Sequence, residues 1–172
     1  MLLMGNGAGG FSEDSEAGGD FVRDIASGRG LIYGNFDNDG DLDLLVTNCG
    51  GRARLYRNDL PKSGNWLRIR VVDHVSGRDT LGSTVIVGTS ERRLTQILAP
   101  QSSYLASHEP VLHFGLRPTE SVESVTVYWP DGPVEMAGEE YPRDRWEVNR
   151  LETLRRGTGT PVAVEINSTG QD

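Results

Sequence analysis

Residues 35–43 read Asn-Phe-Asp-Asn-Asp-Gly-Asp-Leu-Asp, with a carboxylate at every second position from Asp37 to Asp43. A hard cation of calcium's size takes about 6 to 8 oxygen ligands at flexible distances, and alternating acidic residues supply them. Gly40 is the sixth residue of this stretch, where a sharp turn would be obstructed by a side chain. The third, fifth and ninth residues are carboxylates, and the seventh supplies a backbone oxygen. We therefore predict a calcium site formed by Asn35, Asp37, Asp39, Asp41 and Asp43.

The same stretch does not satisfy an EF-hand in either register. The twelfth residue is Val46 instead of Glu when the count begins at Asn35, and Leu42 replaces the glycine when it begins at Asp37. An acidic surface turn without metal is the alternative, because Asn, Asp and Gly are ordinary turn residues. Charge density favours the ion, since four carboxylates within seven residues repel one another unless a cation or solvent compensates them.

The segments around this loop are short apolar runs separated by turn residues, which is typical of strands. A content of 22 Gly and 8 Pro also suits a turn-rich β protein better than a helical bundle. Pro61–Gly64 has the composition of a linker and marks the expected domain boundary. The strands expected before it are Leu2-Leu3, Phe21-Val22, residues 31–33, residues 42–46 and Leu55-Tyr56.

Beyond the linker, residues 66–71 alternate apolar with basic side chains, as a half-buried strand does. Trp129–Gly132 predicts a hairpin turn that returns through residues 134–136. Residues 146–154 fit a strand or a short helix, and the tail beyond Ser168 is expected to be disordered. The other expected strands are residues 84–87, 94–98, 111–116, 122–129 and 161–166, whose spacing favours a β-sandwich.

Composition excludes several classes of protein. The net charge of −8 argues against a nucleic-acid partner, which would require a basic face. Cys49 is the only cysteine, so no intramolecular disulfide is expected. No apolar run approaches the 18 residues of a membrane span, and Met1–Met4 is too short for the apolar core of a signal peptide. We therefore expect a soluble chain without membrane insertion.

Residues 28–46, from Gly28-Arg29-Gly30 through the acidic loop to Leu44-Leu45-Val46, resemble the FG-GAP or VCBS repeat of integrin-like β-propellers. The turn at residues 6–11 and the segment Leu55–Asn58 resemble the repeat's other parts. Asn35 departs from the repeat, which often has Asp there. The resemblance implies a propeller-blade-like sheet over residues 1–64 that binds Ca²⁺. A propeller needs about four to eight blades, so one blade must cover its apolar face in another way.

From residue 65 onward the chain resembles the ASPIC/UnbV domain, which follows FG-GAP repeats in related proteins. The resemblance covers Asn65–Ile69, Ser103–Ser107, Leu112–Leu116 and Val127–Gly132, and it departs at Leu81–Ser83. It implies an antiparallel β-sandwich domain over residues 65–166, with residues 167–172 as a flexible tail. The family implies an extracellular binding or adhesion module without established catalytic residues, and an extracellular or periplasmic location.

Several motifs suggest other chemistry only weakly. Residues 5–10 match the spacing of a dinucleotide fingerprint, but no amphipathic helix follows, so a turn is favoured. His108 and His113 are five residues apart with Pro110 between them, which does not suit a zinc-peptidase helix. The carboxylates of Glu109 and Asp131 are a conceivable catalytic pair. Tyr104, Trp66, Trp129 and Trp146 would suit a sugar-binding surface, although core packing is expected for most of them.

The sequence thus predicts an all-β, non-catalytic, extracellular binding or adhesion module with a structural Ca²⁺ loop. We expect a glycan or protein ligand, and either a homodimer or docking of the first segment on the second module or on further propeller blades. The alternatives are a fragment of a carbohydrate-active enzyme or lyase that uses acidic residues and His108, and an assembly piece of a larger β-propeller.

Overall fold

The computed structural model describes residues 3–14, 16, 18–62, 64–131, 138–142 and 146–162. The chain forms two compact units. The first unit contains residues 1–62 together with residues 101–109, and the second contains residues 63–100 and 110–172. Residues 101–109, which we call the 101–109 segment, thus belong to the first unit although they lie within the second half of the sequence.

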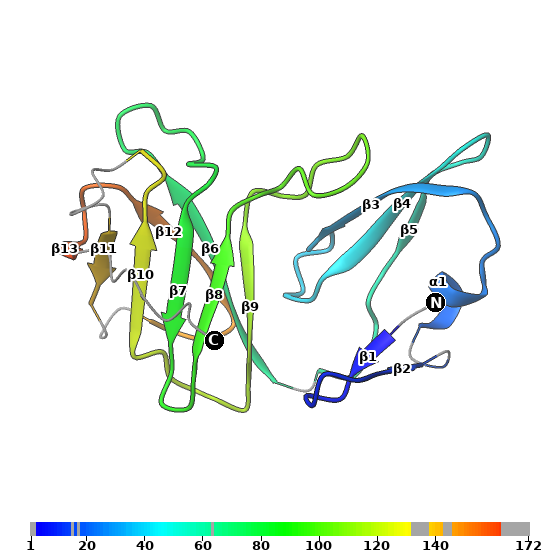
Figure 1. The fold of residues 1–172 in the computed structure, drawn as a ribbon, viewed down its shortest axis with the longest axis horizontal. Coiled ribbons are helices and arrows are strands. Elements are labelled where there is room, and N and C mark those ends of the chain that lie inside the picture. Colours follow the sequence, from blue (N-terminus) through cyan, green and yellow to red (C-terminus); the bar gives the residue numbers. More distant parts are fainter. Residues whose placement is uncertain are drawn as a thin grey trace, which may run out of the picture. The chain divides into compact units, whose positions relative to one another are not determined.

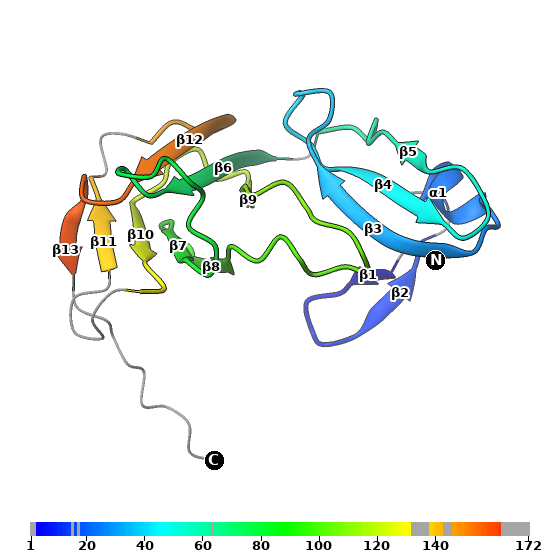
Figure 2. The same ribbon diagram turned by 90° about the horizontal axis from the view of Figure 1, so that it is seen from above.

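The first unit consists of short strands and one short helix (Figures 1 and 2). A two-stranded antiparallel sheet pairs β1 with β2, and a three-stranded antiparallel sheet has the order β3-β4-β5. The turn between β1 and β2 is closed by Asn6 Oδ1, which accepts hydrogen bonds from the Ala8 and Gly10 amides, so the glycines of residues 5–10 form a turn as predicted. The elements are β1 (Leu3–Gly5), β2 (Phe11–Glu13), α1 (Gly19–Arg23), β3 (Gly28–Gly34), β4 (Asp43–Asn48) and β5 (Arg54–Tyr56).

The expectation of a strand at Phe21-Val22 was wrong, because these residues lie in α1. Gly19 begins the helix with a φ of 48°, and the Asp24 amide donates to the Asp20 carbonyl at the other end. A pair of apolar residues is too short to reveal a period of 2 or 3.6, so the local pattern could not separate strand from helix. The chain is therefore predominantly β with one helix in its described part.

The second unit contains a five-stranded sheet of order β13-β11-β10-β7-β8 and a three-stranded sheet of order β12-β6-β9 (Figure 1). Its strands are β6 (Asn65–Val72), β7 (Thr84–Gly88), β8 (Arg93–Ile97), β9 (Leu112–Arg117), β10 (Ser124–Tyr128), β11 (Gly138–Tyr141), β12 (Arg150–Arg155) and β13 (Thr160–Val162). These pairs are antiparallel except β12 with β6, which is parallel. The expectation of a wholly antiparallel arrangement was therefore wrong at this pair.

The strand predictions for this half of the chain are confirmed where the residues are described. Residues 146–154 contain the strand β12, which settles the choice between strand and helix. The return of the hairpin through residues 134–136, the end of the last expected strand after Val162, and the tail lie outside the described residues.

One hydrophobic core fills the second unit. The alternation of β6 buries Leu67, Ile69 and Val71 completely, and Phe114 of β9 is 1% exposed. Strands of both sheets contribute to this core, so their apolar faces cover one another. The core consists of Leu67, Ile69, Val71, Val85, Val87, Leu98, Leu112, Phe114, Leu116, Val122, Val125, Val127, Trp129, Tyr141, Trp146 and Leu154.

The first unit differs from the second in that its described residues include no buried hydrophobic side chain. Among the described residues, every buried hydrophobic side chain belongs to the second unit. The apolar side chains of the β3-β4-β5 sheet and its loop stay accessible, with Leu31 40%, Phe36 47% and Leu55 58% exposed. Within the described residues, no helix has the length and apolar character needed to cross a membrane.

Candidate functional site

The acidic loop joins β3 to β4, and Gly34 pairs with Asp43 where the two strands meet it. Gly40 has a φ of 103°, the left-handed conformation that glycine adopts without steric cost, and Asn38 reaches 64°. The sharp turn predicted at Gly40 is confirmed. The local sequence therefore folds as a tight loop in which Asp37 and Asp39 are exposed, Asp41 is half-buried and Asp43 is buried.

Asp43 is the buried acid of this loop, with 2% of its surface exposed. Its Oδ2 accepts a hydrogen bond from the Phe36 amide at 2.9 Å, and its Oδ1 accepts one from the Asn58 amide at 2.9 Å. One carboxylate thus joins the beginning of the loop to the segment that follows β5.

The more exposed carboxylates bind backbone amides and basic side chains. Asp37 Oδ1 accepts from the Asp39 amide at 3.2 Å, and Asp39 Oδ1 accepts from the Asp41 amide at 2.9 Å. Lys62 Nζ lies 3.5 Å from Asp39 Oδ2 and donates to the Asp39 carbonyl at 2.6 Å. The Asp41 amide lowers the pKa of Asp39 most, and the Lys62 ammonium lowers it further. The loop's negative charge is therefore compensated in part by the protein itself.

Asn35, at the start of the loop, carries an oxygen without a partner. The residue is 9% exposed, and its Oδ1 is buried with no hydrogen-bond donor. Such a group is costly to bury and invites a partner outside the protein. Across the described residues, however, no group of three or more His, Cys, Asp or Glu side chains is placed to hold a metal ion. The loop thus supplies oxygen atoms of the right kind, while the calcium site itself stays a prediction.

The outer edge of β3 is covered by the 101–109 segment. The Leu31 amide donates to Ser103 Oγ at 2.9 Å, and the Tyr33 amide donates to His108 Nδ1 at 3.1 Å. The imidazole of His108 also stacks on the Tyr33 ring, with centroids 3.8 Å apart. Side chains from a distant part of the sequence therefore satisfy amides that point away from β4.

Ser102 and His108 have the distance of a catalytic pair but not its proton arrangement. Ser102 Oγ lies 2.7 Å from His108 Nε2. Because Nδ1 accepts from the Tyr33 amide, a neutral imidazole carries its proton on Nε2 and donates it to Ser102. A histidine that activates serine needs the opposite tautomer, with a free Nε2. The pair is therefore suited to holding the segment in place.

Comparison with known proteins assigns the family. Residues 74–161 match the profile of the ASPIC and UnbV family, which is about half of the chain. The chain belongs to this family. The matched range contains the 101–109 segment and excludes the acidic loop, so the FG-GAP resemblance of residues 28–46 stays a prediction.

Three relatives of this ASPIC and UnbV protein are called cartilage acidic protein 1. The mouse protein is 33% identical over 156 residues, an alignment that covers 82% of this chain and 24% of the mouse protein. The human protein is 35% identical over 118 residues, covering 66% of this chain and 18% of the relative. The Xenopus tropicalis protein is 32% identical over 120 residues, covering 67% and 18%. The chain thus spans less than a quarter of the length of these relatives.

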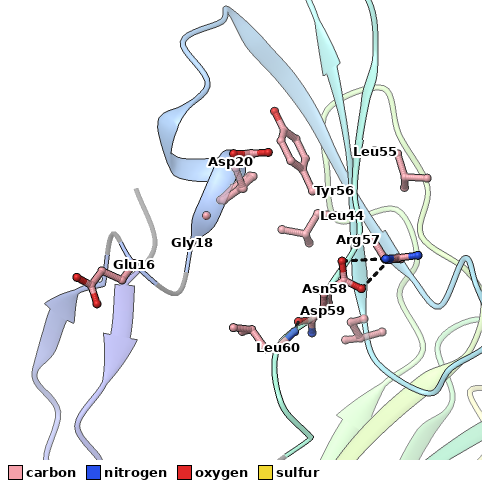
Figure 3. Close-up of a pocket in the computed structure, with 13 residues that line it drawn as sticks. Glu16, Gly18, Asp20, Leu44, Leu55, Tyr56, Arg57, Asn58, Asp59 and Leu60 are labelled. Atoms are coloured by element: carbon pink, nitrogen blue, oxygen red, sulfur yellow. Dashed lines mark hydrogen bonds and ion pairs between the residues drawn. The ribbon is translucent and has the colours of Figure 1, made fainter.

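A pocket of about 560 Å³ lies in the first unit of this family member, beside α1 and β5 (Figure 3). This volume falls within the range of about 300–1,000 Å³ found for small-molecule sites. Two of its polar side chains already have partners, because Arg57 Nε lies 2.7 Å from Asp59 Oδ1 and the Tyr56 hydroxyl donates to Asp24. Burial is the main cause of the raised pKa of Tyr56. The lining residues include Phe21, Leu42, Leu44, Leu55 and Leu60, so the pocket offers mainly apolar surface.

The other candidate residues are divided between the two units. His113 lies on β9 of the second unit and stacks on Trp66 at 6.0 Å, whereas His108 belongs to the first unit. Asp131 is paired with Arg156 at 2.7 Å in the second unit, and Glu109 belongs to the first.

The aromatic residues and the cysteine are likewise divided between the two units. Trp129 and Trp146 are buried, as expected for core residues, while Tyr104 is 64% exposed in the first unit. Cys49 is exposed in the turn after β4.

Proposed function

We propose that this chain is a non-catalytic, extracellular binding module in which the 35–43 loop holds a structural Ca²⁺ ion. The observation that carries the proposal is the buried, unpartnered Oδ1 of Asn35 at the start of an oxygen-rich loop. Asp37, Asp39 and Asp43 supply carboxylate oxygens, and Asp41 supplies a backbone oxygen, which is the donor chemistry that calcium prefers. The resemblance of residues 28–46 to calcium-loop repeats supports the same conclusion.

The ion would neutralise the acidic residues of the loop, and its binding would be linked to folding of the first unit. Lys62 competes for the same charge because its ammonium lies beside Asp39. The extracellular placement fits this role, because weak calcium loops are occupied where calcium is at about 10⁻⁴ to 10⁻³ M.

The test is thermal unfolding in calcium and in chelator. At 100 times its Kd, the ion should add about 2.7 kcal/mol to the free energy of unfolding, seen as a higher melting temperature of the first unit. Asp39→Ala should abolish the difference between calcium and chelator. Asp20→Ala is a matched control, because Asp20 is an exposed acid in α1 with only a 3.9 Å contact to Arg23.

Lys62→Ala extends the same experiment. Removing the competing ammonium should leave the calcium response intact or increase it. Equal melting temperatures of the unaltered chain in calcium and chelator, with a normally folded first unit, would remove the ion from the proposal.

A second role, as an assembly piece, is favoured by the exposed sheet of the first unit. Leu31, Phe36 and Leu55 remain 40–58% exposed, and no described hydrophobic residue of this unit is buried. Exposed apolar surface of this kind is typical of an interaction face. Leu55 lies on the face of the sheet that also carries Leu45 and Ile32, because these residues are paired across the strands, whereas Leu31 lies on the opposite face. We propose that the Leu55 face is covered by a second copy of the chain or by further blades of a longer protein.

Light scattering over a dilution series measures this association. The expected result is a molar mass that falls from dimer to monomer on dilution, with Leu55→Glu shifting the transition to higher concentration. Ile97→Glu is the control, because Ile97 is 59% exposed on β8 of the second unit. A monomer of 18.8 kDa at every concentration argues against self-association.

A further inference from the structure

β3 is an edge strand of the β3-β4-β5 sheet, and its outward amides need acceptors. The 101–109 segment supplies them as side-chain atoms, Ser103 Oγ for Leu31 and His108 Nδ1 for Tyr33. These two amides are the groups that another strand would use to extend the sheet. The segment therefore acts as a cover of this edge.

The sequence of β3 permits this close contact. A Cβ atom built on Gly30 would lie 2.8 Å from the Tyr104 carbonyl oxygen and 3.1 Å from the Ala106 Cβ. The first contact is with backbone, which cannot move away as a flexible side chain does. Gly30 thus allows the segment to approach the strand.

The bond from the Tyr33 amide requires a neutral His108. The ring is buried, with 6% of the residue exposed, and its Nδ1 must be free of a proton to accept this bond. When imidazole is protonated, both of its nitrogens become donors, so Nδ1 would face the donor of Tyr33 with a proton of its own. His108 therefore cannot be protonated while its Nδ1 accepts the bond from the Tyr33 amide.

Among the described residues, titratable groups near the imidazole come from β3 and from the 101–109 segment. β3 presents the phenol ring of Tyr33, which is stacked on it, and the segment contributes the neighbouring Glu109, whose side chain lies beside Gly34. Asp43, opposite Gly34, turns its carboxylate to the Phe36 and Asn58 amides. Burial is the cause that lowers the pKa of His108. The covered state thus favours the neutral ring.

We propose that His108 is a pH-sensitive latch, which holds the 101–109 segment on the edge of β3 when neutral and releases it when protonated. On release, the 101–109 segment moves away from β3, while the strand pairs of the β1-β2 and β3-β4-β5 sheets persist. In acid, the Leu31 and Tyr33 amides would become available to solvent or to a partner strand.

The direction of the pH dependence follows from the lowered pKa. His108 binds a proton more readily when the segment is released. The segment therefore covers the edge of β3 fully above the ordinary histidine pKa of about 6.5, and this covering weakens as the pH falls below that value. One proton is involved, so the covering equilibrium should change by about tenfold per pH unit until the pH reaches the lowered pKa of the covered state.

Amide hydrogen exchange of Tyr33, measured by NMR between about pH 8 and about pH 5, tests the latch. The protection factor corrects for the intrinsic pH dependence of exchange. We expect it to fall about tenfold per pH unit below about pH 6.5, while tryptophan emission stays constant. Trp66, Trp129 and Trp146 all belong to the second unit, so their emission detects loss of that fold.

Two variants test the hydrogen-bond acceptor of His108 separately from the stacking of its ring on Tyr33. His108→Asn keeps an oxygen acceptor near the position of Nδ1 but cannot titrate, so Tyr33 should stay protected throughout this pH range. His108→Phe keeps a ring to stack on Tyr33 but has no acceptor, so protection should be low at every pH. His113→Asn is the matched control on β9 and should follow the unaltered chain.

A pH titration of the unaltered chain tests the latch without the use of any variant. The NMR shifts of the His108 ring and of the Tyr33 amide should change with the same midpoint. A pH-independent protection factor in the unaltered chain, or the same pH dependence in His108→Asn, would overturn the latch.

Discussion

Replacing Asp43 by Ala should lower the free energy of unfolding of the first unit by about 2–6 kcal/mol, because two part-buried amides lose a charged acceptor at about 1–3 kcal/mol each. Those amides belong to Phe36 and Asn58, and both bonds measure 2.9 Å. The measurement is denaturant unfolding in chelator, followed by hydrogen exchange of β4. Chelator separates this structural role of Asp43 from any role in binding Ca²⁺.

Two further variants act as controls for Asp43. Asp43→Asn keeps one oxygen acceptor, so its loss of stability should be smaller than that of the alanine variant. Asp59→Ala removes an exposed carboxylate from the neighbouring segment, where an exposed ion pair contributes about 0–1 kcal/mol. If Asp43→Ala is no less stable than Asp59→Ala, the two amide bonds do not stabilise the loop.

Phe114→Ala should cost the second unit about 3–5 kcal/mol, the usual loss when a buried phenylalanine is cut to alanine. Phe114 is 1% exposed on β9 and lies opposite Leu67 of β6, so its removal leaves a cavity in the shared core. Tryptophan emission during urea unfolding measures the effect. The slope of the unfolding curve should stay unchanged, because the exposed area of the unfolded chain is nearly the same.

Ile97→Ala on β8 is the control for this core substitution. Its side chain is 59% exposed, and surface substitutions usually change stability by less than about 0.5 kcal/mol. A Phe114→Ala variant as stable as Ile97→Ala would mean that the two sheets do not share the core described above.

Local patterns in the sequence predicted much of the second unit. Residues 66–71 were expected to alternate apolar with basic side chains, and β6 buries Leu67, Ile69 and Val71, although Arg68 is buried as well, with 5% exposed. The strands β7, β8, β9 and β10 also lie where short apolar runs were bounded by turn residues. Such patterns are informative because one buried face selects one period.

The candidate site was predicted only in part. The spacing of acids around Gly40 predicted the loop and its sharp turn, since these depend on neighbouring residues. The sequence did not reveal that Lys62 would lie beside Asp39, or that Asp43 would bind the Asn58 amide. These contacts depend on how β4 and β5 pair, which the loop sequence alone does not specify.

What the sequence determined by itself is most of the strands of the second unit, the acidic loop and the membership of residues 74–161 in the ASPIC and UnbV family. Tertiary structure alone decided that the 101–109 segment belongs to the first unit and that β12 runs parallel to β6. The bond from the Leu31 amide to Ser103 joins residues 72 positions apart. Contacts over such distances leave no periodic signal, because they arise from the complementary shape and hydrogen bonding of surfaces that form only after the strands have paired.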